Sequence, residues 1–248
     1  MPVAMDPLTL ALVFATFFFA AFLKGTAGLG FATTCLGIMA AFLDVRQAIP
    51  LVIIPSVLSN ALVMIDAGGF LPILRRFRFM LLATLPGLFV GLWLLGGSSS
   101  ATPRLVLGAA MFLYGGWGLW GGTLQLVQRP LLDTAVGLVT GAVNGLTGSQ
   151  IMPILPYLMS LDITKDQLVQ AINTSFTLSS VIMLVGLNRL GLVSMEVLAV
   201  SVAGLVPVFL GILVGSKVRH RLPEPAYRRV VFALIGVLGL GLILRAFL

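Results

Sequence analysis

Lys24 is the one basic residue that lies well inside an apolar stretch of this 248-residue chain. An ammonium group in hydrocarbon is costly, so intramembrane lysines usually face a cavity or a partner of opposite charge. No carboxylate lies near Lys24 in the sequence, and a bound anion would supply the missing negative charge. The other interpretation is that Lys24 ends its segment and extends its ammonium to the membrane interface. The chemistry that this residue indicates is anion binding.

Glycines interrupt two apolar stretches, one beside Lys24 and one in the second half of the chain. They are Gly25, Gly28 and Gly30 in the first stretch, and Gly145 and Gly148 in the second. Helices that begin near Gly28 and Gly148 would point free N–H groups at these breaks, and such N-termini attract anions. Glycine also lets the backbone approach an oxyanion closely. Alternatively, these glycines only allow helices to pack closely.

Polar side chains gather near the two breaks and in one later segment of each half. Buried amides are costly to leave without a partner in lipid, whereas serine and threonine often bond to their own helix. The sequence therefore predicts an anion site whose substrate-binding residues are Lys24, Gly25, Gly28, Gly30, Ser56, Asn60, Asn144, Gly145, Gly148, Ser149, Gln150, Asn173 and Thr174.

Other kinds of site lack the residues they need. Cys35 is the only cysteine and His220 the only histidine, so neither a disulfide nor a Cys/His metal site is expected. The acids fall at segment ends or in loops, with Asp66 and Glu196 closest to a span interior. We therefore predict no enzyme activity, no metal and no cofactor. Transport of another small anion or of a cation, and a non-transporting role in membrane assembly, remain as alternatives.

The composition places these residues in a polytopic membrane protein. Of all residues, 59% are hydrophobic and 9% are charged, whereas soluble domains carry about 25% charged residues. The net charge of +7 fits basic cytoplasmic loops better than nucleic-acid binding. We expect a lipid bilayer and a small anion as partners, and the sequence leaves a homo-oligomer open.

Breaks between apolar runs predict ten helical segments. A full span needs about 20 residues, and the short segments form two adjacent pairs at corresponding places in the two halves. Short, glycine-interrupted segments so arranged are typical of transporter binding sites. The predicted segments are roughly 8–24, 28–43, 46–66, 79–97, 103–122, 131–146, 149–161, 167–187, 194–215 and 227–248.

Two basic clusters predict the orientation. Arg75, Arg76 and Arg78 follow the third segment, and five basic residues lie between Lys217 and Arg229 after the ninth. Basic loops are cytoplasmic, and an even number of segments separates the two clusters. Both termini are therefore expected outside the cytoplasm.

The two halves repeat one pattern with opposite orientation. A glycine-rich break is followed by an apolar run and then by Leu43-Asp44-Val45 in the first half and Leu161-Asp162-Ile163 in the second, 118 residues later. We predict an all-α protein of two inverted-topology repeats, 1–125 and 126–248, within one membrane domain. Each repeat should hold a broken or re-entrant helix hairpin followed by three spanning helices.

The stretches from Phe22 to Phe31 and from Gly141 to Gly148 resemble the duplicated glycine-rich motif of the sulfite exporter TauE/SafE family. The resemblance covers roughly residues 8–247 and includes the length, the duplication and the Leu-Asp turn after each hairpin. It implies a permease of the bacterial inner membrane for sulfite, thiosulfate or a small organosulfonate. The inverted repeats would place that anion near the midplane, between the two glycine-rich hairpins.

Overall fold

A computed structural model of the chain describes residues 6–27, 30–121, 124–219 and 224–247, and the regular structure in these ranges is entirely α-helical. The helices are α1 (Pro7–Ala27), α2 (Phe31–Met39), α3 (Val45–Ala67), α4 (Phe70–Arg76), α5 (Arg78–Gly97), α6 (Ala101–Leu119), α7 (Pro130–Thr147), α8 (Ile154–Met159), α9 (Lys165–Arg189), α10 (Met195–Ala203), α11 (Leu205–Arg219) and α12 (Glu224–Ala246). This confirms the predicted all-α class.

Six of the described helical stretches are long and apolar enough to cross a membrane. They lie in α1, α3, α5, α9, α12 and the consecutive pair α10–α11. The segment predicted at 103–122 forms α6 but is not among these six, whereas the segment predicted at 8–24 is. The helix α4 is an addition, because the sequence predicted only a loop at 67–78.

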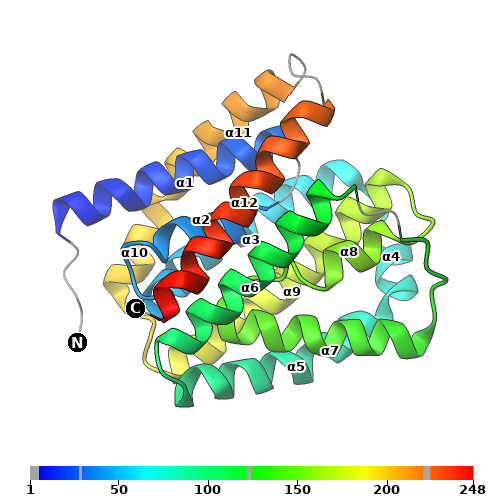
Figure 1. The fold of residues 1–248 in the computed structure, drawn as a ribbon, viewed down its shortest axis with the longest axis horizontal. Helices are drawn as coiled ribbons and strands as arrows, with labels where there is room; N and C mark the ends of the chain where they lie inside the picture. The colour runs from blue at the N-terminus through cyan, green and yellow to red at the C-terminus, as the bar shows by residue number, and fades with distance from the viewer. Residues whose placement is uncertain (1–5, 28–29, 122–123, 220–223, 248) are drawn as a thin grey trace.

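The helices pack as pairs around a central pair, α3 and α9 (Figure 1). The outer pairs are α1 with α11, α5 with α7, and α6 with α12. Glycine makes this packing close, since a Cβ atom built on Gly91 of α5 would lie only 2.2 Å from the Ala142 carbonyl oxygen of α7. A Cβ atom on Gly215 of α11 would lie 2.3 Å from the Phe22 oxygen of α1. The outer helices therefore touch backbone to backbone.

Local side-chain bonds fix where the helices begin. The Asp44 carboxylate accepts a hydrogen bond from the Arg46 N–H at the start of α3, and Thr164 and Gln167 form a capping box at the start of α9. Such caps satisfy N–H groups that have no partner within the helix. Before α1, the hydroxyl and N–H of Thr9 bond to Asp6 and lower the pKa of that exposed carboxyl group.

Proline also shapes the central helix α3. Pro55 has no N–H to donate, so the Leu51 carbonyl oxygen four residues earlier loses its helical partner. The Ser201 hydroxyl of α10 donates to that oxygen at 2.7 Å. This bond ties α10 to the middle of α3.

The two glycine-rich breaks differ in structure. Gly30 precedes α2 with a φ of 93°, so a helix begins close to the first predicted position. Gly148 has a φ of 75° but ends α7, and α8 begins only at Ile154. The prediction of a helix start near Gly148 is therefore wrong. A helix starting there would place Pro153 and Pro156 in its interior, whereas a start at Ile154 leaves Pro156 in the first turn, where proline is tolerated.

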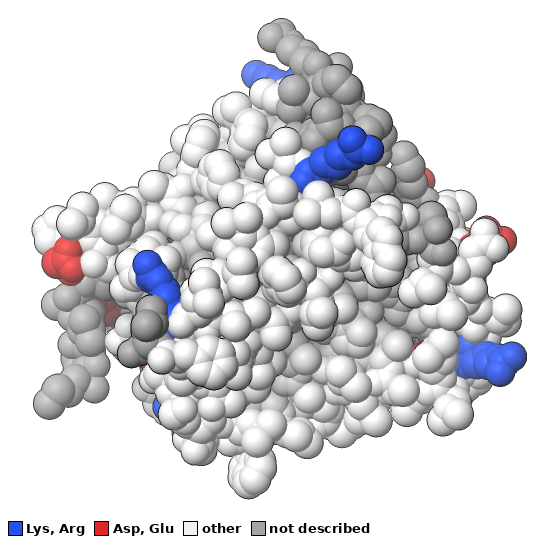
Figure 2. Space-filling view, viewed as in Figure 1, with Lys and Arg blue, Asp and Glu red and all other residues white. Residues whose placement is uncertain are grey.

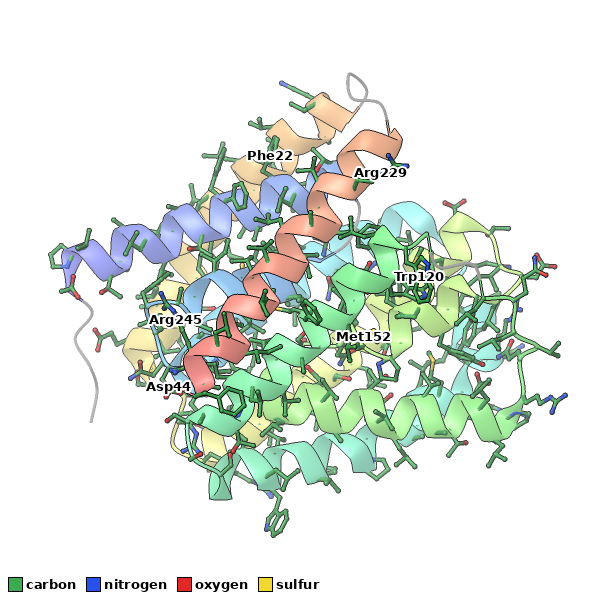
Figure 3. The ribbon with its side chains drawn as sticks, in the orientation of Figure 1. Phe22, Asp44, Trp120, Met152, Arg229 and Arg245 are labelled. Atoms are coloured by element: carbon green, nitrogen blue, oxygen red, sulfur yellow. The ribbon has the colours of Figure 1, made fainter. Side chains whose placement is uncertain are left out.

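The outer face is apolar and its charges lie at the rim. Figure 2 shows few lysine, arginine and acidic side chains on the face in view, most of them at its edges. Figure 3 shows Arg245 and Asp44 at one end of the bundle and Arg229 at the other end of α12. An apolar belt between charged ends is the surface expected of a multi-pass membrane protein.

Candidate functional site

The Lys24 side chain is buried near the end of α1 and is held by α3. Its exposed fraction is 4%. The ammonium Nζ donates to Ser59 Oγ at 3.0 Å and to Asn60 Oδ1 at 2.7 Å. Both acceptors are neutral, and within the described ranges no carboxylate lies at salt-bridge distance from Lys24. The structure thus places a buried ammonium group without a counter-ion.

A cavity of about 40 Å³ lies next to Lys24. A single water needs about 10–15 Å³ of such space, so the cavity has room for a few waters or one small ion. Its walls come from α1, α2, α3, α7 and α9 and from the segment after α7. The lining residues are Lys24, Gly30, Phe31, Ala32, Leu36, Ile49, Val52, Ile53, Ser56, Asn60, Asn144, Gly148, Gln150, Asn173, Phe176, Ser180 and Met183.

Two polar atoms at the cavity lack a hydrogen-bond partner among the described residues. They are the buried hydroxyl of Ser56 and the buried amide nitrogen of Asn60. Leaving a buried donor unpaired costs about 1–3 kcal/mol. The Asn60 amide is oriented by its own Oδ1, which accepts from Lys24. A ligand that accepts hydrogen bonds would satisfy these donors.

Two other amides on the cavity wall are already positioned. The Asn173 Nδ2 donates to the Val169 carbonyl oxygen at 2.8 Å, and Gln150 Oε1 accepts from the Ser175 hydroxyl at 3.3 Å. The bond to Ser175 leaves the Gln150 NH₂ group as the donor end of that side chain. The wall is therefore rich in donors.

The first turn of α2 borders the same cavity. Gly30, Phe31 and Ala32 all line it. The first N–H groups of a helix have no intrahelical partner and carry the positive end of the helix dipole. Together with Lys24, this wall is suited to an anion. Metal binding has no comparable support, since the described residues contain no cluster of three or more His, Cys, Asp or Glu.

The structure brings eight of the thirteen predicted site residues to this one cavity. They come from both halves of the chain and are Lys24, Gly30, Ser56, Asn60, Asn144, Gly148, Gln150 and Asn173.

The remaining predicted residues lie elsewhere. Gly25 and Gly145 lie in helix contacts, where a Cβ atom would meet the Ile212 oxygen at 2.6 Å and the Leu88 oxygen at 2.3 Å. The alternative interpretation, close helix packing, fits these two glycines.

Ser149, Thr174 and Gly28 complete the list. Ser149 Oγ lies 2.7 Å from Thr33 Oγ1 and so joins the segment after α7 to α2. Thr174 is buried and its hydroxyl has no hydrogen-bond partner among the described residues, but it does not line the cavity. Gly28 falls outside the described residues.

Sequence reasoning missed two kinds of residue. Ser59 and Ser180 are polar but were not selected, although Ser59 binds Lys24 directly and Ser180 lines the cavity. The apolar wall, which includes Phe31 and Phe176, gave no signal because such residues look the same whether they face lipid, core or a ligand.

One buried acid lies away from the cavity. Asp133 is 2% exposed, and its carboxylate accepts from the Tyr157 hydroxyl at 2.6 Å and from the Gln128 amide at 3.0 Å. It belongs to the first turn of α7, and Gly148 caps the other end of that helix. These bonds fasten α8 and the preceding loop to α7, so we interpret Asp133 as structural.

Comparison with known proteins gives one match. The family model described as sulfite exporter TauE/SafE matches residues 13–242. No curated protein and no solved structure matches the chain.

Proposed function

The chain belongs to the sulfite exporter TauE/SafE family, whose members are membrane transporters of sulfite-type anions, and we propose that the cavity at Lys24 is its substrate site. Sulfite, thiosulfate or a small organosulfonate would bind there, between the two glycine-rich breaks. The match over residues 13–242 supports a transporter and not an enzyme. The protein would lie in the bacterial inner membrane.

The observation that carries this proposal is the buried charge of Lys24. Among the described residues, its ammonium is bonded only to the neutral groups of Ser59 and Asn60. A buried charge needs a partner of opposite sign, because hydrogen bonds alone do not offset its lost hydration. A bound sulfur oxyanion would supply that partner and would also accept from Ser56 and Asn60.

Equivalent positions in the two halves support a repeat. At a constant spacing of 120 residues, the helix-capping residue Asp44 matches Thr164, and the packing residue Gly25 matches Gly145. The same spacing pairs five cavity-lining residues of the first half with five of the second: Lys24 with Asn144, Gly30 with Gln150, Ile53 with Asn173, Ser56 with Phe176, and Asn60 with Ser180. We therefore propose repeats 1–125 and 126–248, with 120 as the register in place of 118.

Helix contacts support an inverted relation between these repeats. The spacing of 120 matches α1 with α7 and α5 with α11, and the structure packs α1 on α11 and α5 on α7. In our proposal, the hairpins α1–α2 and α7–α8 enter the membrane from opposite sides and meet at the cavity. Both termini lie outside, and the basic loops lie in the cytoplasm.

Flux through reconstituted protein tests the proposed function. Proteoliposomes with wild-type protein should take up labelled sulfite faster than empty vesicles do. Lys24→Gln removes the buried charge and should reduce flux at low substrate about ten- to hundredfold, because one charge-assisted contact contributes about 1.5–3 kcal/mol.

Lys217→Gln is the matched control, since Lys217 is an exposed lysine on α11. It should leave flux unchanged. Equal flux in wild-type and Lys24→Gln vesicles would show that Lys24 does not contact the substrate. No flux above that of empty vesicles for sulfite, thiosulfate and alkanesulfonates would contradict the transport function itself.

A further inference from the structure

The cavity carries one positive charge. Lys24 is the only lysine, arginine or histidine among its described lining residues, and no acid lines it. The matching position in the second half holds the neutral amide of Asn144. The inverted relation that we propose therefore does not double the charge. A single negative charge would make the occupied site neutral.

Lys24 and the helix α3 together offer several donors to a ligand. Two of the three Lys24 protons are used by Ser59 and Asn60, which leaves one for a ligand. The unpaired donors of Ser56 and Asn60 lie on α3, the helix that holds Lys24. A ligand can thus bind its charged group here with a few directed bonds.

Apart from the amides of Asn144, Gln150 and Asn173 and the hydroxyl of Ser180, the rest of the lining is apolar. Its large members include Phe31, Leu36, Phe176 and Met183. These side chains cannot donate to an oxyanion, so an oxygen atom placed against them loses its hydration without a replacement. An alkyl group placed there would instead gain from burial.

Given the proposed function, we infer that the cavity selects small monoanions with an apolar end, such as short alkanesulfonates, over dianions such as sulfate and thiosulfate. Lys24 neutralises the first negative charge of any ligand. A second negative charge would be buried without a partner, and its lost hydration would not be recovered. Discrimination against dianions therefore depends on the missing second cation as much as on Lys24.

Methanesulfonate and sulfate form the sharpest pair of probes. Both are tetrahedral and close in size, and they differ in one methyl group that replaces a charged oxygen. Neither changes its protonation near neutral pH, so the comparison does not depend on the titration of the ligand. Calorimetric titration of the purified wild-type protein should show methanesulfonate binding at least about tenfold more tightly than sulfate.

A second cation should shift the preference for methanesulfonate toward sulfate. Asn144→Lys places a charge at the position matched to Lys24, and Ser180→Lys does so at a half-buried wall position. Each variant that elutes as a single folded species should shift the ratio of sulfate to methanesulfonate affinity by about tenfold or more toward sulfate. Asn188→Lys adds the same charge at an exposed position of α9 and should leave the ratio unchanged.

The outcomes separate the two levels of the proposal. If wild-type protein binds sulfate or thiosulfate as tightly as methanesulfonate, monoanion selection is wrong while the anion site stands. If no probe binds, the proposed anion site fails together with the inference. A tighter binding of ethanesulfonate than methanesulfonate would support the apolar end, and a much weaker one would overturn it.

Discussion

At the scale of single residues, Asn60 is the partner that defines the state of Lys24. Its Oδ1 accepts from the ammonium at 2.7 Å, while its Nδ2 is buried without a hydrogen bond. A neutral amide orients the charge without neutralising it. The negative charge that would neutralise Lys24 is therefore left to a ligand.

Asn60→Asp should inactivate the site without unfolding the protein. A carboxylate at this position would form an ion pair with Lys24 and repel an incoming anion. Binding of methanesulfonate should weaken at least about tenfold, because a charge-assisted contact is lost. The melting temperature should not fall, since the buried charge gains a permanent partner. Calorimetry and thermal unfolding in detergent measure the two effects.

The control for this variant is Asn188→Asp, the same change at an exposed position of α9. It should alter neither affinity nor melting temperature. Unchanged affinity in N60D would mean that the anion does not depend on the charge of Lys24.

The sequence could indicate only those residues of the candidate site whose side chains are costly to bury in lipid. Charged and amide side chains are rare inside apolar segments. This rarity distinguishes Lys24, Asn60, Asn144 and Asn173. Ser180 lacks such a cost, since a serine can bond to its own helix. Only the register of 120 residues, which matches it with Asn60, identifies it in retrospect.

At the scale of helices, close packing of α5 on α7 positions Asn144 at the cavity. Gly91 of α5 faces Gly145 of α7, and a Cβ atom on Gly91 would lie 2.7 Å from the Gly145 Cα atom. Asn144 precedes this contact directly. The distance between the two helices therefore sets where the Asn144 amide stands.

Gly91→Ala should destabilise the protein by forcing α5 and α7 apart. The added methyl would lie 2.2 Å from the Ala142 carbonyl oxygen, which is backbone and cannot rotate away. Overpacking of this kind costs about 1–3 kcal/mol, so the midpoint of thermal unfolding should fall. Anion affinity should weaken as well, because Asn144 moves with α7.

Gly116→Ala serves as the matched control in α6. Apart from the neighbouring backbone of its own helix, no described atom lies within 4 Å of a Cβ atom built there. Alanine also favours a helix over glycine by up to about 1 kcal/mol. Its melting midpoint should stay the same or rise. If both variants melt alike, backbone contact between α5 and α7 does not limit stability.

The apolar runs predicted where the helices lie, but the glycines did not predict every helix start. The sequence has a similar glycine break at Gly30 and at Gly148. After Gly148, the prolines at 153 and 156 oppose an immediate helix start, and the next helix begins at Ile154. The short helix α4 was also beyond reach, since seven residues are too few for a periodic signal. The segment predicted at 149–161 contains α8, but that helix is only six residues long.

At the scale of the whole molecule, both halves line one cavity, and only the first supplies a basic residue among the described lining. The central helices α3 and α9 each contribute residues to the lining, as do the segments around Gly30 and Gly148. The sequence predicted a duplication from its short segments. It could not find which side chains converge, because that depends on how one half packs against the other.

In our proposal, an anion binds at Lys24 inside this cavity. Crystals of the wild-type protein grown with selenite, a heavier relative of sulfite, would locate it by the anomalous scattering of selenium. We predict a peak within the cavity, with an oxygen about 2.7–2.9 Å from Lys24 Nζ, and no such peak in crystals of Lys24→Gln. An empty cavity beside a well-occupied selenium site elsewhere on the protein would contradict the account.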